Sequence, residues 1–525
     1  MTTPAFITFA IMLLAGLVFL GLMLRWDMQM LQQNSYFASR YWRWLTQSQE
    51  GTTVKRLVMM AIMVALVVPF VYNSYYNIAL LTLCIVGLIA SDLRKKYKLP
   101  LKYTKRVKMQ LAAALLLCIA VVAAVVSREG WLNGCRVTVA LTIISPFITL
   151  LINWILTPYR RWEQNKFLNM AKEKLAGMPQ LTVVGITGSY GKTSTRTFLG
   201  KILSEQYSVC LPPGNFNTTL GVVRTINEVL RPYDQVYVCE MGAKNVGDIK
   251  EICDIVRPKF GIVTAVGEMH LETFKTPENV QRTKFELVDA LPSDGMAIIN
   301  NDWPLVASRD VSNVPTLRYA MNEGEQVDYH VEDLSYNERG THFTVVGGDT
   351  RIQLTTKLVG ESNISNLMAA VIMAIQLDVP QEKIQYAVSR IEQVEHRLSM
   401  KRAGGITIID DAYNSNPTGS RMALDVLSQM PGTHFVIIPG MIELGKMQEQ
   451  RNREFGEHIA KTADVAIIVG EYNRDAIVSG IQAAGFNPDR LHTVATFTEG
   501  YALMLSLAQQ GDTVLLENDL PDTFK

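Results

Sequence analysis

A glycine-rich segment sets the fold of most of this chain: Val183-Val184-Gly185-Ile186-Thr187-Gly188-Ser189-Tyr190-Gly191-Lys192-Thr193-Ser194-Thr195. The apolar run 181–184 is typical of a buried β-strand, and residues 196–203 have the pattern of a helix. In a loop between such elements, backbone N–H groups face an anion, the lysine adds positive charge and the next threonine can ligate Mg²⁺. We therefore predict a nucleotide-phosphate site made of Gly188, Ser189, Tyr190, Gly191, Lys192, Thr193 and Ser194.

The glycine spacing of this loop is a variant. The most common phosphate-binding pattern has glycine where Ile186 stands, whereas glycines here recur at every third position, 185, 188 and 191. A glycine-rich turn alone is a weak signal, because structural turns use the same residue. The run Gly-Lys-Thr-Ser between a strand and a helix favours nucleotide binding over a structural turn.

The composition of the whole chain excludes several classes of protein. Its 50 basic and 49 acidic residues give a net charge of +1, which provides no general attraction to nucleic acid. The 6 cysteines include no C-x-x-C pair, so neither a disulfide framework nor a zinc site is expected. The hydrophobic content of 48% is at the top of the usual range. These values indicate a protein with reduced thiols that face the cytosol.

The first 158 residues are predicted to form a membrane domain of five helices. Apolar runs about long enough to span a bilayer lie at 6–24, 57–72, 75–90, 111–126 and 137–156. The first run lacks the charged leader and cleavage site of a signal peptide, so we interpret it as a retained anchor. Pro69 and Pro146 are tolerable inside membrane helices.

The distribution of basic residues predicts the orientation of these helices. Lysine and arginine are concentrated after the first and third runs, with eight of them between Arg94 and Lys108. Because basic loops remain on the cytoplasmic side, the chain after residue 156 is expected in the cytoplasm of a multi-pass cell-membrane protein. Contact with membrane lipid follows from this placement. We interpret the cluster itself as a topology signal rather than a specific lipid site.

The rest of the chain has the alternating strand and helix pattern of parallel α/β domains. A polar connector at 159–180 precedes a P-loop-type ATPase domain at 181–394 and a Rossmann-like domain at 395–525. Strands are expected at 181–184, 235–239, 260–265, 296–299, 406–409, 434–438, 465–469 and 513–516. Residues 328–358 have a more antiparallel pattern.

Polar residues follow several of these strands, where ligands collect in open α/β sheets. Glu240 follows a buried strand beside the loop and is suited to hold Mg²⁺, although a capping carboxylate is an alternative. His270 follows the strand at 260–265 and, taken alone, is more often structural. Lys284 lies on the apolar face of a helix that begins near Pro277, where extension of its ammonium group to solvent is the simpler reading.

The loop 410–417 contains two acids, two amides and a proline, and it follows another strand. It is suited to hold a sugar or another substrate, and it is equally suited to form a turn and a helix cap.

Taken together, seven phrases resemble the Mur ligase family, which makes cell-wall peptide bonds with ATP. They are Ile186-Thr187-Gly188-Ser189-Tyr190-Gly191-Lys192-Thr193, Gly214-Asn215-Phe216-Asn217, Glu240-Met241-Gly242-Ala243, Met269-His270-Leu271-Glu272, Thr283-Lys284-Phe285-Glu286, Asp411-Ala412-Tyr413-Asn414-Ser415-Asn416-Pro417 and Gly440-Met441-Ile442-Glu443-Leu444-Gly445. The resemblance is strongest to the type that adds D-alanyl-D-alanine to UDP-N-acetylmuramoyl-tripeptide.

The resemblance implies roles for the matching residues. Lys192 and the backbone of 189–193 would hold the β- and γ-phosphates, and Thr193 with Glu240 would hold one Mg²⁺. His270 would hold a second, bridged by a carbamylated Lys284. The remaining matches concern the nucleotide: Asn363 would contact adenine, and Arg397, Asp411 and Asn414 would close over the ATP. Lys192, Lys284, His270 and Glu240 would thus be the catalytic set.

The implied reaction has two steps. A carboxylate of a cell-envelope precursor would attack the γ-phosphate to give an acyl phosphate, and the amine of an amino acid or dipeptide would displace phosphate. Three departures leave the substrates open. The family's UDP-sugar domain has no counterpart here, Ser362 replaces a histidine, and Glu517-Asn518-Asp519 replaces a Lys-Gly-Ser phrase. The acceptor is therefore UDP-linked or lipid-linked, and the membrane region favours the second.

Two other functions fit parts of the sequence. A membrane-anchored ligase that makes poly-γ-glutamate also pairs an anchor with this ATP-binding unit, but the complete third domain argues against it. A membrane scaffold with a degenerate ATPase fold is disfavoured because Lys192, Thr193, Glu240, His270 and Lys284 are all present. The apolar runs also carry almost no charge that could serve a transport site.

Overall fold

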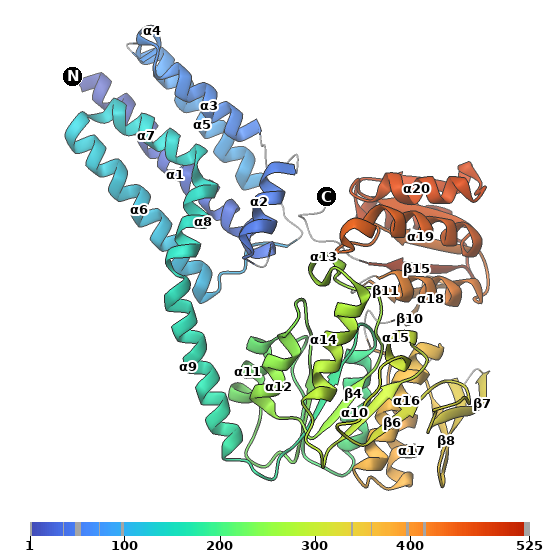
Figure 1. The fold of residues 1–525 in the computed structure, drawn as a ribbon. Helices are drawn as coiled ribbons and strands as arrows, with labels where there is room; N and C mark the ends of the chain where they lie inside the picture. The colour runs from blue at the N-terminus through green and yellow to red at the C-terminus, as the bar shows by residue number, and fades with distance from the viewer. Residues whose placement is uncertain are drawn as a thin grey trace. The chain divides into compact units, whose positions relative to one another are not determined.

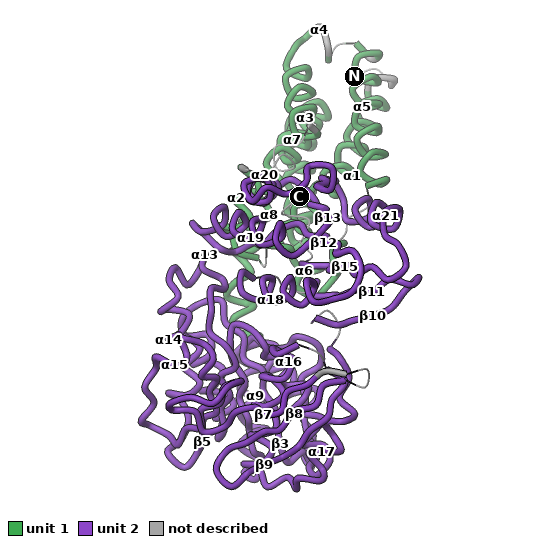
Figure 2. The backbone as a smooth tube through the Cα atoms, turned by 90° about the vertical axis from the view of Figure 1, so that its right-hand side faces the viewer, with its two compact units in different colours: residues 1–163, 520–525 green, residues 164–519 purple. Residues whose placement is uncertain are grey.

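In the computed structural model, the chain forms two compact units, residues 1–163 with 520–525 and residues 164–519 (Figure 2). The structure describes residues 3–34, 36–47, 54–72, 74–95, 99–337, 340–358, 360–394, 398–412 and 416–518.

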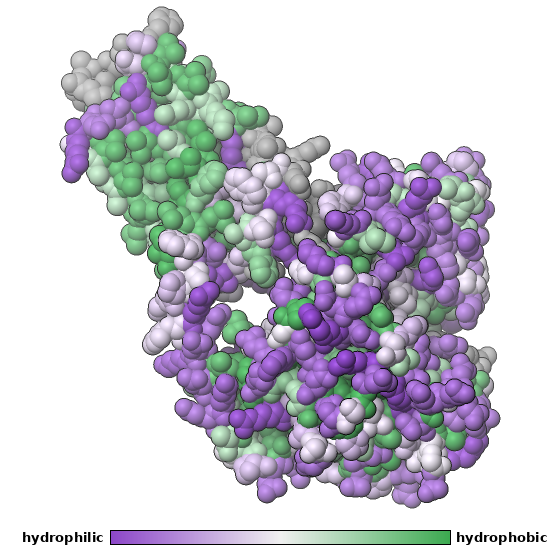
Figure 3. Space-filling model, viewed as in Figure 1, coloured by the Kyte–Doolittle hydropathy of each residue, from purple (hydrophilic) through white to green (hydrophobic). Residues whose placement is uncertain are grey.

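Unit 1 is helical. Its helices are α1 (Thr3–Gln33), α2 (Ala38–Gln47), α3 (Val54–Ala65), α4 (Pro69–Tyr72), α5 (Tyr75–Arg94), α6 (Lys105–Glu129), α7 (Trp131–Ile143), α8 (Ser145–Ile155) and the start of α9 (Thr157–Ala176). Large apolar side chains are exposed on several of them, and Figure 3 shows hydrophobic residues over most of the visible surface of this unit.

Three helices of unit 1 are long and apolar enough to cross a membrane: Phe6–Gln33, Tyr76–Arg94 and Lys105–Glu129. The pair α7 and α8 would count as a fourth span, although its two helices are bent by 72°. The described part of the chain thus offers up to four candidates rather than the five predicted.

Prolines account for the difference. α3 ends at Ala65 and a separate short helix begins at Pro69, which divides the run predicted at 57–72. α7 ends at Ile143, and Pro146 lies in the first turn of α8. Proline has no N–H for the preceding turn, and its ring clashes with the carbonyl four residues earlier. The expectation that both prolines lie inside continuous helices was wrong.

A buried carboxylate joins four helices of unit 1. Asp27 of α1 has no exposed surface. It accepts hydrogen bonds from Tyr41 of α2 at 3.0 Å, Arg56 of α3 at 2.6 Å and Ser145 of α8. These three donors compensate a charge that would otherwise be costly to bury.

In unit 2, the first sheet is parallel and has the strand order β2-β3-β1-β4-β5-β6. Two of its strands, β4 and β6, are labelled in Figure 1. Its strands are β1 (Thr182–Thr187), β2 (Val209–Cys210), β3 (Val236–Glu240), β4 (Phe260–Val263), β5 (Met296–Asn300) and β6 (Thr316–Tyr319). The chain moves to one side of β1 through β2 and β3 and then to the other through β4. The carboxyl end of β1 therefore lies where the strand order reverses, which is where ligands bind in such sheets.

Both faces of this sheet are covered by helices. The residue Val184 faces α10 (Lys192–Leu203), α16 (Glu361–Gln376) and α17 (Gln381–Ser389). The adjacent Val183 faces α11 (Thr219–Glu228), α12 (Asp248–Val256) and α14 (Pro277–Asp289). Successive side chains of a strand point to opposite faces, so two covered faces require a continuous apolar run.

The shorter elements around this sheet are α13 (Leu271–Phe274) and α15 (Pro304–Ala307). A small antiparallel sheet, β7 (His330–Asn337), β8 (Gly340–Gly347) and β9 (Thr350–Thr356), packs its apolar residues into the same core as α16 and α17. It lies in the segment for which an antiparallel pattern was predicted, and that prediction is confirmed.

The last sheet has the order β10-β11-β15-β12-β13-β14. Its strands are β10 (Ser399–Ala403), β11 (Ile406–Asp411), β12 (His434–Ile438), β13 (Val465–Val469), β14 (Leu491–Val494) and β15 (Thr513–Glu517). β10 is antiparallel to β11, and the other neighbours are parallel. One face packs against α18 (Pro417–Ser428), α19 (Gln448–Thr462) and α20 (Arg474–Ala483), and the other against α21 (Phe497–Leu507). Short 3₁₀ turns lie at Gly445–Met447 and Pro488–Arg490.

Candidate active site

The predicted phosphate loop joins β1 to α10, and two of its glycines are required by the backbone. Gly191 has φ +80°, and a Cβ placed on it would lie 2.0 Å from Oδ1 of Asn366. Gly188 has φ +151°, and a Cβ there would lie 2.2 Å from Oγ1 of Thr264. Only glycine combines these dihedral angles with the absence of a side chain. The loop is therefore held closely between the segment that follows β4 and helix α16.

Substitution of Gly191 by alanine is expected to weaken nucleotide binding at least tenfold, because the left-handed backbone and the clash with Asn366 both distort the loop. Equilibrium binding of ATP would measure this. Gly485→Ala is the matched control, because Gly485 has φ +77° and nothing within 4 Å of the added Cβ. Equal losses in both variants would show that the loop geometry is not the cause.

Lys192 is folded over this loop. Its Nζ donates to the carbonyl oxygens of Gly188 at 2.7 Å and Ser189 at 3.2 Å. Its ammonium group is thus held beside the backbone that would surround a phosphate. The N–H of Ser189 donates instead to the carbonyl oxygen of Ala265 at 2.6 Å. That N–H, expected to bind phosphate, is engaged within the protein.

The remaining loop residues are less directly placed for phosphate. The Tyr190 hydroxyl donates to the carbonyl oxygen of Glu268 at 3.2 Å, and its ring packs against Trp303 with the ring centres 5.3 Å apart. Ser194 is buried in the first turn of α10. Tyr190 therefore supports the loop from the side of the β4–α13 connection.

Glu240, at the end of β3, lies beside the loop. Its carboxylate is 1% exposed, and Oε1 accepts hydrogen bonds from Thr193 Oγ1 at 3.1 Å and Asn217 Nδ2 at 2.9 Å. Nη1 of Arg196 is 3.1 Å from Oε2 but is not aligned to donate to it, so Oε2 accepts no hydrogen bond from a described residue. A buried carboxylate oxygen that accepts no hydrogen bond, next to a threonine hydroxyl, is a suitable ligand for Mg²⁺.

The described residues contain no group of three or more His, Cys, Asp or Glu side chains that could hold a metal by themselves. Mg²⁺ binds through one or two protein groups and through substrate phosphates, and it usually keeps several waters. The pair Thr193 and Glu240 is consistent with such a site.

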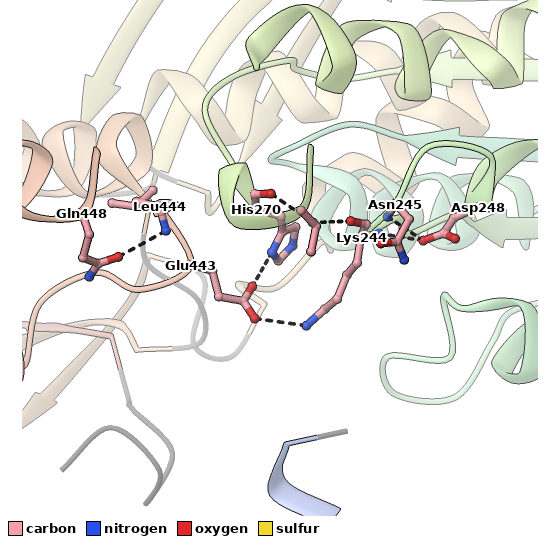
Figure 4. A network of polar contacts seen from close by, with 8 residues as sticks. Lys244, Asn245, Asp248, His270, Glu443, Leu444 and Gln448 are labelled. Carbon is pink, nitrogen blue, oxygen red and sulfur yellow. Dashed lines mark hydrogen bonds and ion pairs between the residues drawn. The ribbon is translucent and has the colours of Figure 1, made fainter. Parts of the chain in front are cut away.

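His270 lies at the start of α13, with φ +52°. Its Nδ1 forms a short hydrogen bond with Oε2 of Glu443, whose Oε1 is 3.4 Å from Nζ of Lys244 (Figure 4). Burial lowers the pKa of His270, and the adjacent Glu443 opposes this shift. A neutral imidazole is the form that ligates metals.

Lys284 is buried on α14, with 2% of its surface exposed. Burial holds its pKa well below the usual range, and the positive charge of Lys192 lowers it further. In the described part of the chain, no carboxylate lies within ion-pair distance of it, and Nζ is 5.9 Å from the centre of the Phe274 ring. The simpler reading of Lys284 taken by itself, in which its ammonium group extends to solvent, was wrong. An amine in this environment is uncharged more often, and only an uncharged amine reacts with CO₂.

Two of the residues matched to nucleotide contacts are described. Asn363, in the first turn of α16, is 7% exposed, and its N–H donates to the carbonyl oxygen of Gly360. Asp411 ends β11, and its Oδ1 accepts from the N–H of Leu398 at 2.9 Å. Arg397 and Asn414 lie outside the described residues. Asn416 caps α18 by accepting from the N–H of Gly419, so this part of the 410–417 loop serves as a helix cap.

The two sheets of unit 2 are linked by ion pairs next to this site. Arg451 of α19 donates to both carboxylate oxygens of Glu268, at 2.7 and 2.5 Å. Glu443 lies 3.4 Å from Nζ of Lys244 through Oε1 and shares a single hydrogen bond with His270 through Oε2. At the end of β15, Glu517 is buried and accepts from Ser420 Oγ at 2.8 Å. Glu517, which stands where the family pattern has a lysine, therefore contributes to the packing of α18.

Three site residues had no predicted role. Asn217 and Glu443 stand in phrases of the resemblance, but a single sequence gives no reason to place either side chain near a metal ligand. Arg196 lies four residues after Lys192, and its contact with Glu240 had no local signal. Each contact joins segments that are far apart in the sequence.

Comparisons with known proteins agree with this geometry. Residues 186–374 match the Mur ligase middle domain, and residues 396–517 match the Mur ligase glutamate ligase domain. The UDP-N-acetylmuramoyl-tripeptide–D-alanyl-D-alanine ligase of Mycobacterium leprae is 31% identical over 386 residues, covering 66% of this chain and 72% of its own length. The enzyme of that name from Bacillus subtilis is 29% identical over 342 residues, with 64% and 72% coverage.

Solved structures are similar as well. MurF from Acinetobacter baumannii has a TM-score of 0.61 and 26% identity, covering 68% of this chain and 77% of that one. MurF from Thermotoga maritima, solved in complex with ADP, has the same TM-score and identity and covers 68% and 80%. With matching middle and C-terminal domains and this arrangement of loop, acid and buried lysine, the chain belongs to the Mur ligase family of ATP-dependent ligases.

Proposed function

We propose that this protein adds D-alanyl-D-alanine to a muramoyl-tripeptide in peptidoglycan synthesis, using ATP to form the amide bond. The observation that carries the proposal is the convergence of Lys192, Thr193 and Glu240 at the carboxyl end of β1 and β3. A lysine, a hydroxyl group and a carboxylate in this arrangement can bind and polarise a nucleoside triphosphate together with Mg²⁺. The relatives named for this reaction supply the substrate class.

The residues present support the assignment of roles. Lys192 would neutralise charge on the β- and γ-phosphates, and Thr193 with Glu240 would hold Mg²⁺, which supplies further neutralisation. His270 and a carbamate formed on Lys284 would hold a second ion. Asn363 would contact adenine, and Arg397, Asp411 and Asn414 would close on the nucleotide from the C-terminal domain.

In the proposed reaction, a substrate carboxylate attacks the γ-phosphorus and ADP leaves, giving an acyl phosphate. The amine of the dipeptide then attacks the carbonyl carbon, inorganic phosphate leaves and an amide forms. Both steps place negative charge on phosphoryl oxygens beside Lys192. The loop and the ion-pair contacts of Arg451 and Glu443 would keep water from the reacting groups while the domains are together.

We also propose that unit 1 lies in the cell membrane as several spans, with residues 164–519 in the cytoplasm. The candidate spans and the basic segments beside them support this placement. A membrane domain favours a lipid-linked carboxylate substrate over a soluble UDP-linked one.

A product-mass assay with the full-length protein in detergent tests these proposals. ATP, D-alanyl-D-alanine and Mg²⁺ would be offered with either UDP-linked or lipid-linked muramoyl-tripeptide. We expect a product heavier by the dipeptide minus water, with the lipid-linked substrate preferred. Product from the UDP-linked substrate alone would reject the lipid-linked preference. Extended chains from labelled glutamate would indicate a polymerising ligase. If none of these substrates supported ATP consumption, the proposal would be rejected.

A further inference from the structure

Two arginines of unit 1 converge on one asparagine. Arg106 lies in the first turn of α6, and Arg160 lies near the start of α9. Nη2 of Arg106 donates to Oδ1 of Asn153 at 3.1 Å, and Nη2 of Arg160 donates to the carbonyl oxygen of the same residue at 3.2 Å. Because both donate to Asn153, the two guanidinium groups lie near each other, and the charge of Arg160 disfavours the positive charge of Arg106. A negative charge between or beside the two guanidinium groups would offset this repulsion.

The described chain does not supply that charge. Nε of Arg106 and Nε of Arg160 are buried and donate to no described residue. The nearby carboxylate of Glu163 pairs with Lys105 at 2.5 Å, and among the described residues neither arginine has a carboxylate within ion-pair distance. Each guanidinium therefore keeps an unused donor as well as an uncompensated charge.

The side chains around the arginines hold them in place. Arg106 lies over the ring of Tyr36, and Arg160 also donates to Oγ1 of Thr157 at 2.8 Å. Gln110, one turn along α6, is fully buried and donates to Asn153 Oδ1 at 2.9 Å, while its own Oε1 accepts no hydrogen bond from a described residue. The cluster thus offers two charged donors and one buried acceptor in a fixed arrangement.

Phosphate is the anion that this combination fits. Guanidinium groups match its several oxygens with paired N–H donors, and two of them balance its charge better than that of a carboxylate. The free Oε1 of Gln110 can accept from a protonated phosphate oxygen or from a neighbouring hydroxyl.

The position of the cluster indicates where such a phosphate would come from. Arg106 lies at the end of the candidate span Lys105–Glu129. Exposed basic and aromatic residues lie beside it in the chain: Lys102, Tyr103, Lys105, Lys108, Tyr159, Arg161 and Trp162. Such residues at the end of an apolar helix are typical of the lipid headgroup level.

We propose that Arg106, Arg160 and Gln110 form a binding site for the phosphate of a membrane lipid headgroup. The proposal rests on the placement of unit 1 in a membrane and adds to it a specific ligand. It also separates Arg106 from the other basic residues between 94 and 108, because its guanidinium is turned into the helices of unit 1.

Native mass spectrometry of the full-length protein in non-ionic detergent tests the site. Dioleoyl phosphatidic acid and dioleoyl glycerol would be titrated separately, because these lipids differ only by the phosphate. We expect at least tenfold tighter binding of phosphatidic acid, and we expect the double variant Arg106→Gln with Arg160→Gln to lose this preference. The control Lys102→Gln with Lys108→Gln removes the same charge from exposed positions and should keep it.

Equal binding of the two lipids, or equal losses in both double variants, would overturn the proposal. Displacement of phosphatidic acid by millimolar inorganic phosphate would also overturn it, because the site would then take free phosphate. If the arginine variant does not fold, the comparison of the two lipids on the unaltered protein decides. Flotation with phosphatidylcholine vesicles tests the membrane placement separately, so a protein that floats without preferring phosphatidic acid rejects only the lipid site.

Discussion

Replacement of Lys192 by alanine is expected to lower ATP turnover by about a hundred- to a thousandfold, the usual effect of removing one group that stabilises transition-state charge. Nζ of Lys192 is held at the loop by the carbonyl oxygens of Gly188 and Ser189, so its position is set before the nucleotide binds. Among the described residues, no other lysine or arginine side chain donates to the carbonyl oxygens of Gly188 or Ser189. Phosphate release at saturating ATP and substrate would measure the loss.

The matched control is Lys201→Ala, because Lys201 lies on the same helix and is exposed. We expect this variant to keep nearly full turnover and both variants to keep the fold, since neither lysine side chain contributes to the core. A Lys192→Ala protein with normal turnover would remove the basis of the phosphate assignment.

Replacement of Lys284 by alanine is expected to lower product formation by about a hundredfold or more, because the proposed carbamate is lost with the amine. The side chain is buried and its pKa is held well below the usual range, so the change removes a group that makes no compensating ion pair with a described residue. Loss of stability is therefore not expected to explain the effect. Formate or acetate added at millimolar concentration should restore part of the rate, because each supplies a carboxylate small enough for the vacated space.

Arg282→Ala is the control for this experiment, since Arg282 is exposed on the same helix. It should be as active as the unaltered protein and insensitive to formate. Rescue of both variants would point to a general effect of the acid. An inactive Lys284→Ala protein that no carboxylic acid restores would count against the carbamate.

The elements that could be predicted from the sequence are those with a strong local pattern. Each of the eight strands expected in unit 2 is present, because strands covered on both faces require continuous apolar runs such as Val236 to Cys239. The strands β2, β6, β10 and β14 were not predicted. β10 contains Lys401 and Arg402, and β2 has only two residues, so neither has an apolar run to identify it.

For the site as well, features with a local sequence pattern could be predicted and long-range contacts could not. The loop from Gly188 to Thr193 could be predicted because its residues are consecutive and its chemistry is local. The contact between His270 and Glu443 spans 173 positions, and no feature of either segment indicates the other. For Lys284, the helical period correctly placed the side chain on the apolar face, but only the surrounding fold determines whether it reaches solvent. The two broken spans were missed because a proline in an apolar run can bend a helix or end it.

The buried carboxylate of Asp27 has a consequence for biosynthesis. Asp27 leaves the ribosome 29 residues before Arg56 and 118 residues before Ser145, which completes its set of donors. Until α8 has been made, one oxygen of this acid has no donor from that helix, and a chain interrupted earlier retains an incompletely paired charge. Because α8 directly precedes α9, Asp27 obtains the last of these three donors shortly before the ligase domains are translated. A chain truncated before α8 would therefore keep a buried acid that lacks its Ser145 donor, whereas a chain with the whole helical unit would not.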